Sequence, residues 1–188
     1  MLVKLLDQEM LPSNEKLRTE ILMGFSKWQV KFDDLVLKII QTKDKTKIRT
    51  IKNKFIDDVE IPAWERIRKI IHSYFAREVK PIIGKISDLN NLLKERHQEI
   101  HFPTINESRK EAFKSFNKWN ENFTKLIISI KESTHEKEIN MVKKKFMVKI
   151  EVPTWDQVKN DMIRYYSKIF LELEAQIQEI IHHFNSLI

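Results

Sequence analysis

Residues 59–67 read VEIPAWERI, and residues 150–158 read IEVPTWDQV. The second stretch begins 91 positions after the first, and each sets a proline two residues before a tryptophan among aliphatic side chains. Proline lacks a backbone donor and disfavours the helical conformation of the residue before it, so the combination is uncommon. Its recurrence at a long spacing indicates an internal duplication, and the same spacing recurs on both sides of the two stretches.

The segment before the first stretch predicts a long amphipathic helix. Its apolar residues recur at steps of three or four, which is the period of one buried helix face. They are Leu17, Ile21, Phe25, Trp28, Phe32, Leu35 and Ile39. Ser13 or Asn14 can cap the first turn, and the polar residues 41–44 can end the helix.

The same apolar pattern returns 91 positions later and predicts a second long helix. Its members are Ala112, Phe116, Trp119, Phe123, Leu126 and Ile130. All four tryptophans of the chain, Trp28, Trp64, Trp119 and Trp155, belong to the matched set. A period that keeps every tryptophan in register predicts a tandem repeat.

Pro62 and Pro153 are expected to interrupt the helix that approaches them. The residue before each proline is β-branched and is predicted to leave the helical region, which gives either a kink or a tight turn. Trp64 and Trp155 then lie two positions inside the next helix, where a bulky ring can fill the gap that a bend opens. A Pro-Trp corner that recognises a ligand is the functional alternative.

The predicted fold is therefore all-α, an elongated helical bundle built from two tandem three-helix repeats of ~91 residues. The expected divisions are a short N-terminal helix at 1–12, a first repeat at 13–102 and a second repeat at 103–188. Pro81 and Gly84 are expected to bend the last helix of the first repeat. Residues 101–108 form the expected linker, with Thr104, Asn106 or Ser108 as the cap of the next helix.

A three-helix repeat of this length with a tryptophan in its first helix, Trp28 or Trp119 here, is similar in outline to spectrin-type repeats. The resemblance covers the number of helices and the repeat length. It implies a spacer or scaffold role. The proline stretch in the middle of each repeat departs from that pattern.

The composition narrows the classes of protein that the chain can belong to. Its 188 residues are 41% hydrophobic, which suffices for a real core, and include two glycines and no cysteine. Without cysteine there is no disulfide, zinc knuckle or thiol nucleophile, which fits a reducing compartment. Residues 1–12 carry Lys4 and Asp7 within an apolar stretch and so lack the core of a signal peptide. No stretch approaches the roughly 18 uncharged residues of a membrane span, and we expect a cytoplasmic protein.

A basic cluster is the first candidate for chemistry, in a chain of net charge +7. Its members are Lys43, Lys45, Lys47, Arg49, Lys52 and Lys54, interrupted by one acid, Asp44. Such a helix can neutralise phosphates of nucleic acid or an acidic partner. Lysines that flank an apolar stripe also commonly lay their stems over the core. Glu136 and Glu138 correspond to Lys45 and Lys47, so the fold does not require this charge.

Metal and catalytic patterns are weaker. The pairs at helical spacing are His97 with His101, Glu132 with His135, and Glu179 with His182. None forms an HExxH motif, and a di-iron bundle needs two further inward glutamates. With two glycines, the chain has no glycine-rich phosphate loop. We therefore expect no enzyme activity, no cofactor and no metal.

The expected function is a non-enzymatic helical-repeat module for protein–protein interaction or scaffolding, as a subunit or fragment of a larger assembly. Two repeats are fewer than most solenoids need, so a protein partner or a second copy is expected to cover an exposed seam. The alternative is a nucleic-acid-binding helical protein that uses the basic cluster. An acidic membrane surface is the weakest of the partners considered.

Overall fold

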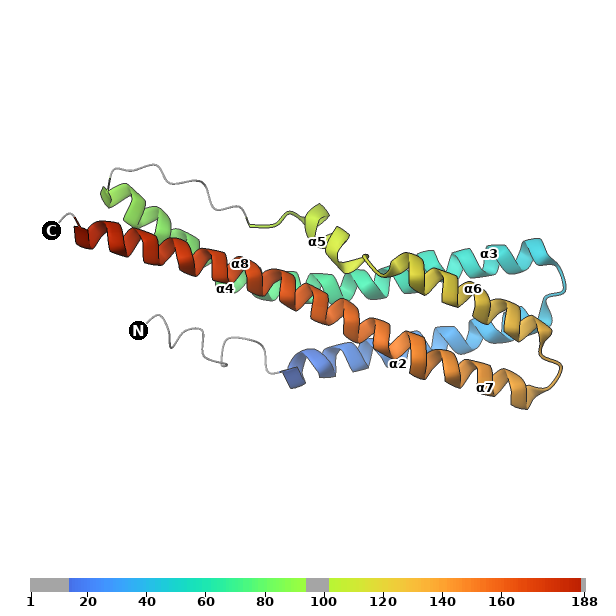
Figure 1. The fold of residues 1–188 in the computed structure, drawn as a ribbon. Helices are drawn as coiled ribbons and strands as arrows, with labels where there is room; N and C mark the ends of the chain where they lie inside the picture. Colours follow the sequence, from blue (N-terminus) through green and yellow to red (C-terminus); the bar gives the residue numbers. More distant parts are fainter. Residues whose placement is uncertain (1–13, 94–101, 187–188) are drawn as a thin grey trace. The chain divides into compact units, whose positions relative to one another are not determined.

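The structure is a computed structural model that describes residues 14–93 and 102–186, and every element in these residues is helical (Figure 1). In chain order they are α2 (Asn14–Gln41), α3 (Lys45–Phe55), the π-helical turn η1 (Ile56–Glu60), α4 (Ile61–Leu93), α5 (Ile105–Ala112), α6 (Phe116–Glu132), α7 (Glu136–Phe146), the π-helical turn η2 (Met147–Glu151) and α8 (Val152–Ser186). The predicted all-α fold is confirmed. The predicted N-terminal helix at 1–12 lies outside the described residues. None of the helices in these two ranges has the length and apolar character that a membrane crossing requires.

The chain divides into two compact units, and each unit contains residues from both predicted repeats. Unit 1 combines Met1–Ile67 with Ser115–Asp156, and unit 2 combines Arg68–Lys114 with Gln157–Ile188. The division runs through α4 and α8, so these two helices contribute to both units. The tandem repeat stays a prediction, and its two halves do not correspond to the two compact units.

Unit 1 contains two helical hairpins, in which α2 packs on α3 and α6 packs on α7. Helices α2 and α6 also pack on each other. Corresponding elements begin 91 positions apart: α3 and α7, η1 and η2, and α4 and α8. The ring contacts follow the same spacing, since Phe32 stacks on Phe146 while Phe123 stacks on Phe55. Each hairpin therefore packs its aromatic residues against the other hairpin.

The backbone at the two prolines differs from the prediction. Ile61 and Val152 keep α-helical dihedral angles, so the expected departure from the helical region and the tight turn are both wrong. Instead the helix passes through a π-helical turn, in which the N–H of Ile61 donates to the carbonyl of Ile56. The wider turn shifts the preceding carbonyls out of the α-helical ladder and relieves the clash that a proline ring makes there.

The second long helix that the apolar pattern predicted is divided in two. Helix α5 ends at Ala112, residues 113–115 form a turn, and α6 begins at Phe116. Phe113 and Ser115 have ψ angles near zero, outside the α-helical region. A break of three residues leaves Ala112 and the seam of α6 buried, so periodicity alone cannot show it. The predicted cap is confirmed at Thr104, which forms a capping box with Glu107.

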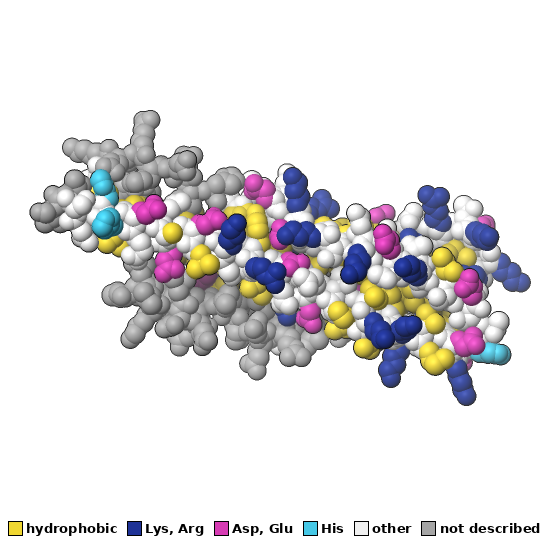
Figure 2. All heavy atoms as spheres, in the orientation of Figure 1, with side chains coloured by type: hydrophobic (Ala, Val, Ile, Leu, Met, Phe, Trp, Pro, Cys, Tyr) yellow, Lys and Arg dark blue, Asp and Glu magenta, His cyan; other side chains and the backbone are white. Residues whose placement is uncertain are grey.

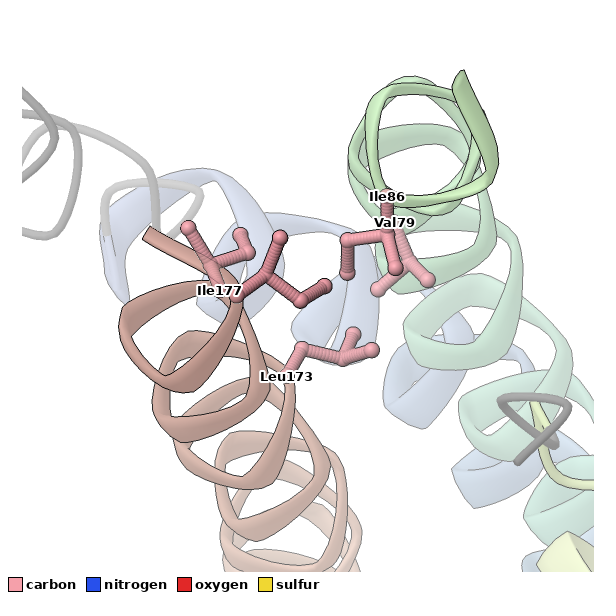
Figure 3. Packing of buried hydrophobic residues seen from close by; sticks show 5 residues of the cluster. Val79, Ile86, Leu173 and Ile177 are labelled. Carbon is pink, nitrogen blue, oxygen red and sulfur yellow. The ribbon is translucent and has the colours of Figure 1, made fainter. Parts of the chain in front are cut away.

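Unit 2 contains α4 from Arg68 onward, α5, and α8 from Gln157 onward. Aliphatic side chains of α4 and α8 meet in its core, which Figure 3 shows for Val79, Ile86, Leu173 and Ile177. Helix α4 passes Pro81 and Gly84 and remains helical to Leu93. The bend expected there stays a prediction.

Candidate functional site

Two glutamates occupy the centre of unit 1. Glu60 is the last residue of η1 and Glu151 is the last residue of η2, and both side chains are 0% exposed. Glutamate is almost never fully buried unless its carboxyl group is paired. The two carboxyl groups hydrogen-bond to each other.

All four tryptophans of the chain donate to these two carboxyl groups. Trp28 Nε1 lies 2.5 Å from Glu60 Oε2, and Trp64 Nε1 lies 2.5 Å from Glu60 Oε1. In the second hairpin Trp119 Nε1 lies 2.8 Å from Glu151 Oε2, and Trp155 Nε1 lies 2.6 Å from Glu151 Oε1. Every carboxyl oxygen therefore accepts one indole N–H. We call these six residues the Glu–Trp cluster.

Local structure explains one tryptophan on each glutamate. Trp64 follows Glu60 by four residues, as Trp155 follows Glu151, and side chains four residues apart share a helix face. The π-helical turn ends at the glutamate, and such turns rotate the side chains that follow relative to those before. The other tryptophan comes from the preceding long helix, 32 residues earlier in both hairpins.

The indole rings also join the two hairpins. Trp28 meets Trp155 with ring centroids 6.4 Å apart, and Trp64 meets Trp119 at 6.2 Å. Each of these edge-to-face pairs brings together rings that donate to different glutamates. Edge-to-face packing adds to the stability gained by burying the rings. The Glu–Trp cluster therefore links α2, α4, α6 and α8 in one network.

Burial sets the protonation of the pair. Desolvation, followed by the charge of Glu151, holds the pKa of Glu60 well above its ordinary value, against the opposing effect of the two indole hydrogen bonds. Desolvation likewise raises the pKa of Glu151 to about 7, while its hydrogen bonds from Trp119 and Trp155 lower it. Two carboxyl groups in contact cannot both ionise without strong repulsion. The pair therefore holds a shared proton at neutral pH and titrates as a unit.

The donor set suits a proton better than a metal ion. A metal needs free oxygen lone pairs, whereas each of these oxygens already accepts an indole N–H. No group of three or more His, Cys, Asp or Glu side chains that could hold a metal occurs within the described residues. Of the pairs considered in the sequence, His97 and His101 lie outside the described residues. The Glu–Trp cluster can act as a polar core that fixes how the two hairpins pair.

The basic cluster does not form one surface. Lys43, Lys45, Lys47 and Arg49 are exposed at the start of α3, where Asp44 caps the helix. Lys52 instead donates to Thr124 Oγ1 of α6 at 2.7 Å. Burial, together with the nearby charge of Arg49, lowers the pKa of Lys52.

Lys54 lies on a groove between α2 and α3. The groove is lined by Lys31, Asp34, Leu35, Lys38, Ile51, Lys54, Phe55, Asp58 and Val59. Its charges are mixed, and Lys38 forms an ion pair with Asp34 at 2.6 Å. Five of the six predicted basic residues are therefore exposed, and Lys52 is engaged with Thr124.

Unit 2 has its own polar network, formed by Arg68, Ser108, Tyr166 and His72. Buried Arg68 donates to the hydroxyl of buried Ser108 at 3.0 Å, and Ser108 donates to the carbonyl of Ile105. His72 bonds the hydroxyl of Tyr166, and burial raises the pKa of that hydroxyl to about 12. The network joins α4, α5 and α8.

The sequence identified four of the six residues of the Glu–Trp cluster, the tryptophans. The predicted structural markers Trp28, Trp64, Trp119 and Trp155 meet in one place, whereas Pro62 and Pro153 are exposed at the starts of α4 and α8. The glutamates were missed, although both stand in the duplicated stretches. Each stretch has a glutamate four residues before a tryptophan of the apolar stripe, and this common position is the sequence feature that could have identified the two glutamates.

No protein-family model, no curated protein and no solved structure matches this chain. The Glu–Trp cluster is therefore interpreted from its geometry alone.

We expect the free energy of unfolding to fall as the pH rises from about 4.5 to about 7. The unfolded chain releases both glutamate protons near the ordinary value of 4.5, while burial makes the folded chain retain them to higher pH. Stability is then greatest below the unfolded pKa and decreases by up to about 1.4 kcal/mol per pH unit for each retained proton. Urea unfolding at a series of pH values measures this slope.

Glu60→Gln with Glu151→Gln should remove this slope, and Asp57→Asn in the same π-helical turn is the matched control on an exposed acid. His72 has a pKa lowered by burial, followed by the charge of Arg68, and so gives a slope of opposite sign below its ordinary value of 6.5. Every variant retains His72, so its contribution cancels when the slopes of two variants are compared. A wild-type slope equal to that of the double variant would contradict the shared proton.

Trp28→Phe should cost about 1–3 kcal/mol, because it leaves a buried carboxyl oxygen without its donor. Trp119→Phe should cost a similar amount at Glu151. Since the lost N–H favours the ionised form, the cost should grow between pH 5 and pH 8. Phe32→Leu, which removes a buried ring from the same stack and no hydrogen bond, should show a cost independent of pH. Equal pH profiles for Trp28→Phe and Phe32→Leu would argue against the hydrogen bonds.

Proposed function

We propose that this chain is a non-enzymatic interaction or scaffold module whose two hairpins arose by internal duplication. The observation that carries the proposal is a row of exposed apolar side chains on α2. Met23, Val30 and Leu37 recur every seven residues and are 56%, 68% and 58% exposed. They lie on the side of α2 away from the buried seam of Trp28 and Phe32. An ordered apolar row outside the core is typical of a surface that binds another helix.

The use of the buried acids also supports a binding module. Acid–base chemistry requires a carboxyl group that can reach a substrate. The side chains of Glu60 and Glu151 are instead fully buried, and each carboxyl oxygen accepts an indole N–H. In this proposal the Glu–Trp cluster stabilises the fold of the module, and residues on the surface bind the partner.

Three features support the duplication. Corresponding helices begin 91 positions apart, both hairpins contain a π-helical turn that ends in a buried glutamate, and each glutamate accepts from two tryptophans at the same spacings. The absence of cysteine suits a reducing compartment, and we infer a cytoplasmic location.

The proposal predicts partner proteins that bind through the α2 row. Tagged protein is purified from native extract with and without nuclease, beside the variant Met23→Lys with Val30→Glu. Both replaced side chains are exposed, and glutamate already stands at the position that corresponds to Val30, Glu121 of α6, so the hairpin should still fold. We expect proteins that survive nuclease and are lost with the variant. A monomer that co-purifies with nothing would overturn the proposal.

A second candidate is nucleic-acid binding by the exposed start of α3. The observation that favours it is the local excess of cations, since Lys43, Lys45, Lys47 and Arg49 face solvent while Asp44 is engaged as the helix cap. Exposed cations on a helix can displace the counterions of phosphates.

Charge reversal tests this candidate. Lys45→Glu with Lys47→Glu reproduces Glu136 and Glu138 of the other hairpin, and Arg49→Glu is added to them. If α3 binds nucleic acid, the affinity for a labelled 20-base-pair duplex should fall. The slope of the logarithm of the affinity against the logarithm of the salt concentration should become shallower by about 0.9 for each lost phosphate contact. Reversal of Lys144, Lys145 and Lys149 is the matched control. Binding that is absent, or equally reduced by both sets, would reject α3 as the nucleic-acid site.

A further inference from the structure

Helices α2 and α7 lie side by side and antiparallel within unit 1. Phe32 of α2 stacks on Phe146 of α7, and Lys143 of α7 forms an ion pair with Asp33 of α2 at 2.5 Å. The order is antiparallel because Phe25, earlier in α2, meets Trp155, later in the chain, with ring centroids 5.2 Å apart. The ion pair places Lys143 on the side of α7 that faces α2.

A second row of exposed apolar side chains accompanies the row on α2. Met141 of α7, Val148 of η2 and Val152 at the start of α8 are 65%, 62% and 42% exposed. Together with Met23, Val30 and Leu37 they form what we call the α2–α7 face. The row on α2 spans 14 residues, or roughly 21 Å, which matches about four turns of a helix.

Lysines surround the second row. Lys137, Lys144, Lys145 and Lys149 are exposed on α7 and η2, and none of them forms an ion pair with another described residue. The acids nearest on α2 are already engaged, since Asp33 pairs with Lys143 and Asp34 with Lys38. Glu138 accepts from the backbone N–H of Thr134. Figure 2 shows lysine and hydrophobic side chains interspersed over α7 and the start of α8.

The corresponding surface of the other hairpin has a different character. Thr50 and Asp57 stand where the α2–α7 face has Met141 and Val148. Lys114 and Glu121 stand in place of Met23 and Val30, and Asn53 and Asp58 stand in place of Lys144 and Lys149. The hairpin thus forms with polar residues at these positions. Leu37 and Val152 correspond to apolar residues, Ile128 and Ile61, and Lys114 lies in the turn before α6. Packing therefore does not require the apolar or basic side chains at Val30, Met141, Lys144, Val148 and Lys149.

We propose that the α2–α7 face binds an acidic amphipathic helix of a protein partner. This inference rests on the proposed interaction function and adds the chemistry of the partner. Each apolar row suits the apolar stripe of a partner helix, and the unpaired lysines beside the second row suit flanking Asp and Glu side chains of that helix.

Two other occupants fit the face less well. A second copy would place the lysines of the two faces against each other, which is unfavourable for a self-complementary interface. A membrane-surface helix usually inserts Trp, Phe or Leu along a broad apolar face. The tryptophans of this unit are buried in the Glu–Trp cluster, and the exposed rows contain one leucine.

Three synthetic 21-residue peptides test the inference by fluorescence anisotropy. The first has leucine at the a and d positions of each heptad and glutamate beside them, the second has lysine in place of glutamate, and the third keeps the glutamates with serine in place of leucine. The full chain should bind the first peptide about tenfold or more tighter than either other peptide.

The matched variant is Met141→Thr, Lys144→Asn and Val148→Asp, which transfers the residues of Thr50, Asn53 and Asp57 to the α2–α7 face. Affinity for the first peptide should fall about tenfold or more, which corresponds to about 1.4 kcal/mol. Thr50→Ala with Asn53→Ala and Asp57→Ala on the opposite surface should leave affinity unchanged. Circular dichroism confirms that each variant is folded.

Several results would overturn the inference. The first peptide could fail to bind, or could bind the matched variant as tightly as it binds the original chain. The chain could instead self-associate in sedimentation, or bind phosphatidylserine vesicles, with the matched variant abolishing that association or binding. Partner proteins that survive nuclease and still bind the matched variant would overturn this inference while leaving the proposed function intact. A protein with neither peptide binding nor partners would overturn both.

Discussion

The architecture of unit 1 depends on two carboxyl groups that share a proton inside a ring of four indoles. Burying two acids is unfavourable unless hydrogen bonds replace their lost hydration. Glu60 and Glu151 obtain those bonds from Trp28, Trp64, Trp119 and Trp155, and from each other. Each glutamate accepts from two tryptophans of its own half of the chain, and the interaction between the two carboxyl groups joins the halves.

The need to satisfy these carboxyl groups affects which arrangement of the two hairpins is favoured more than it affects the overall stability of the fold. Aromatic stacking such as that of Phe32 on Phe146 contributes apolar burial and can tolerate small shifts in register. A shift that separated an indole from its carboxyl group would leave a buried acceptor without a donor, at a cost of about 1–3 kcal/mol. Because the interaction between the carboxyl groups crosses from one hairpin to the other, the polar cluster favours the pairing that keeps Glu60 beside Glu151. It also ties that pairing to pH, since loss of the shared proton places two charges in contact.

The two hairpins share this interior and differ on their outer surfaces. Glu121, Asp57 and Thr50 stand where the α2–α7 face has Val30, Val148 and Met141. In the proposed duplication, the two hairpins keep a common interior while their exteriors are free to diverge. The asymmetry places the proposed recognition on one side of unit 1, and the interior supplies the rigid support that a binding surface requires.

The sequence by itself determined the helices and the buried seam. Steps of three and four residues predicted α2 and α6 from Trp28 and Trp119, and the spacing of 91 related the two hairpins. It did not show the break at residues 113–115 or the π-helical turns, because a local change of backbone path leaves the apolar period nearly intact. Only the tertiary structure decided that Glu60 and Glu151 are buried and meet. An isolated glutamate in a sequence is expected in solvent, and the groups that make its burial tolerable include a tryptophan 32 residues earlier and the other glutamate, 91 residues away.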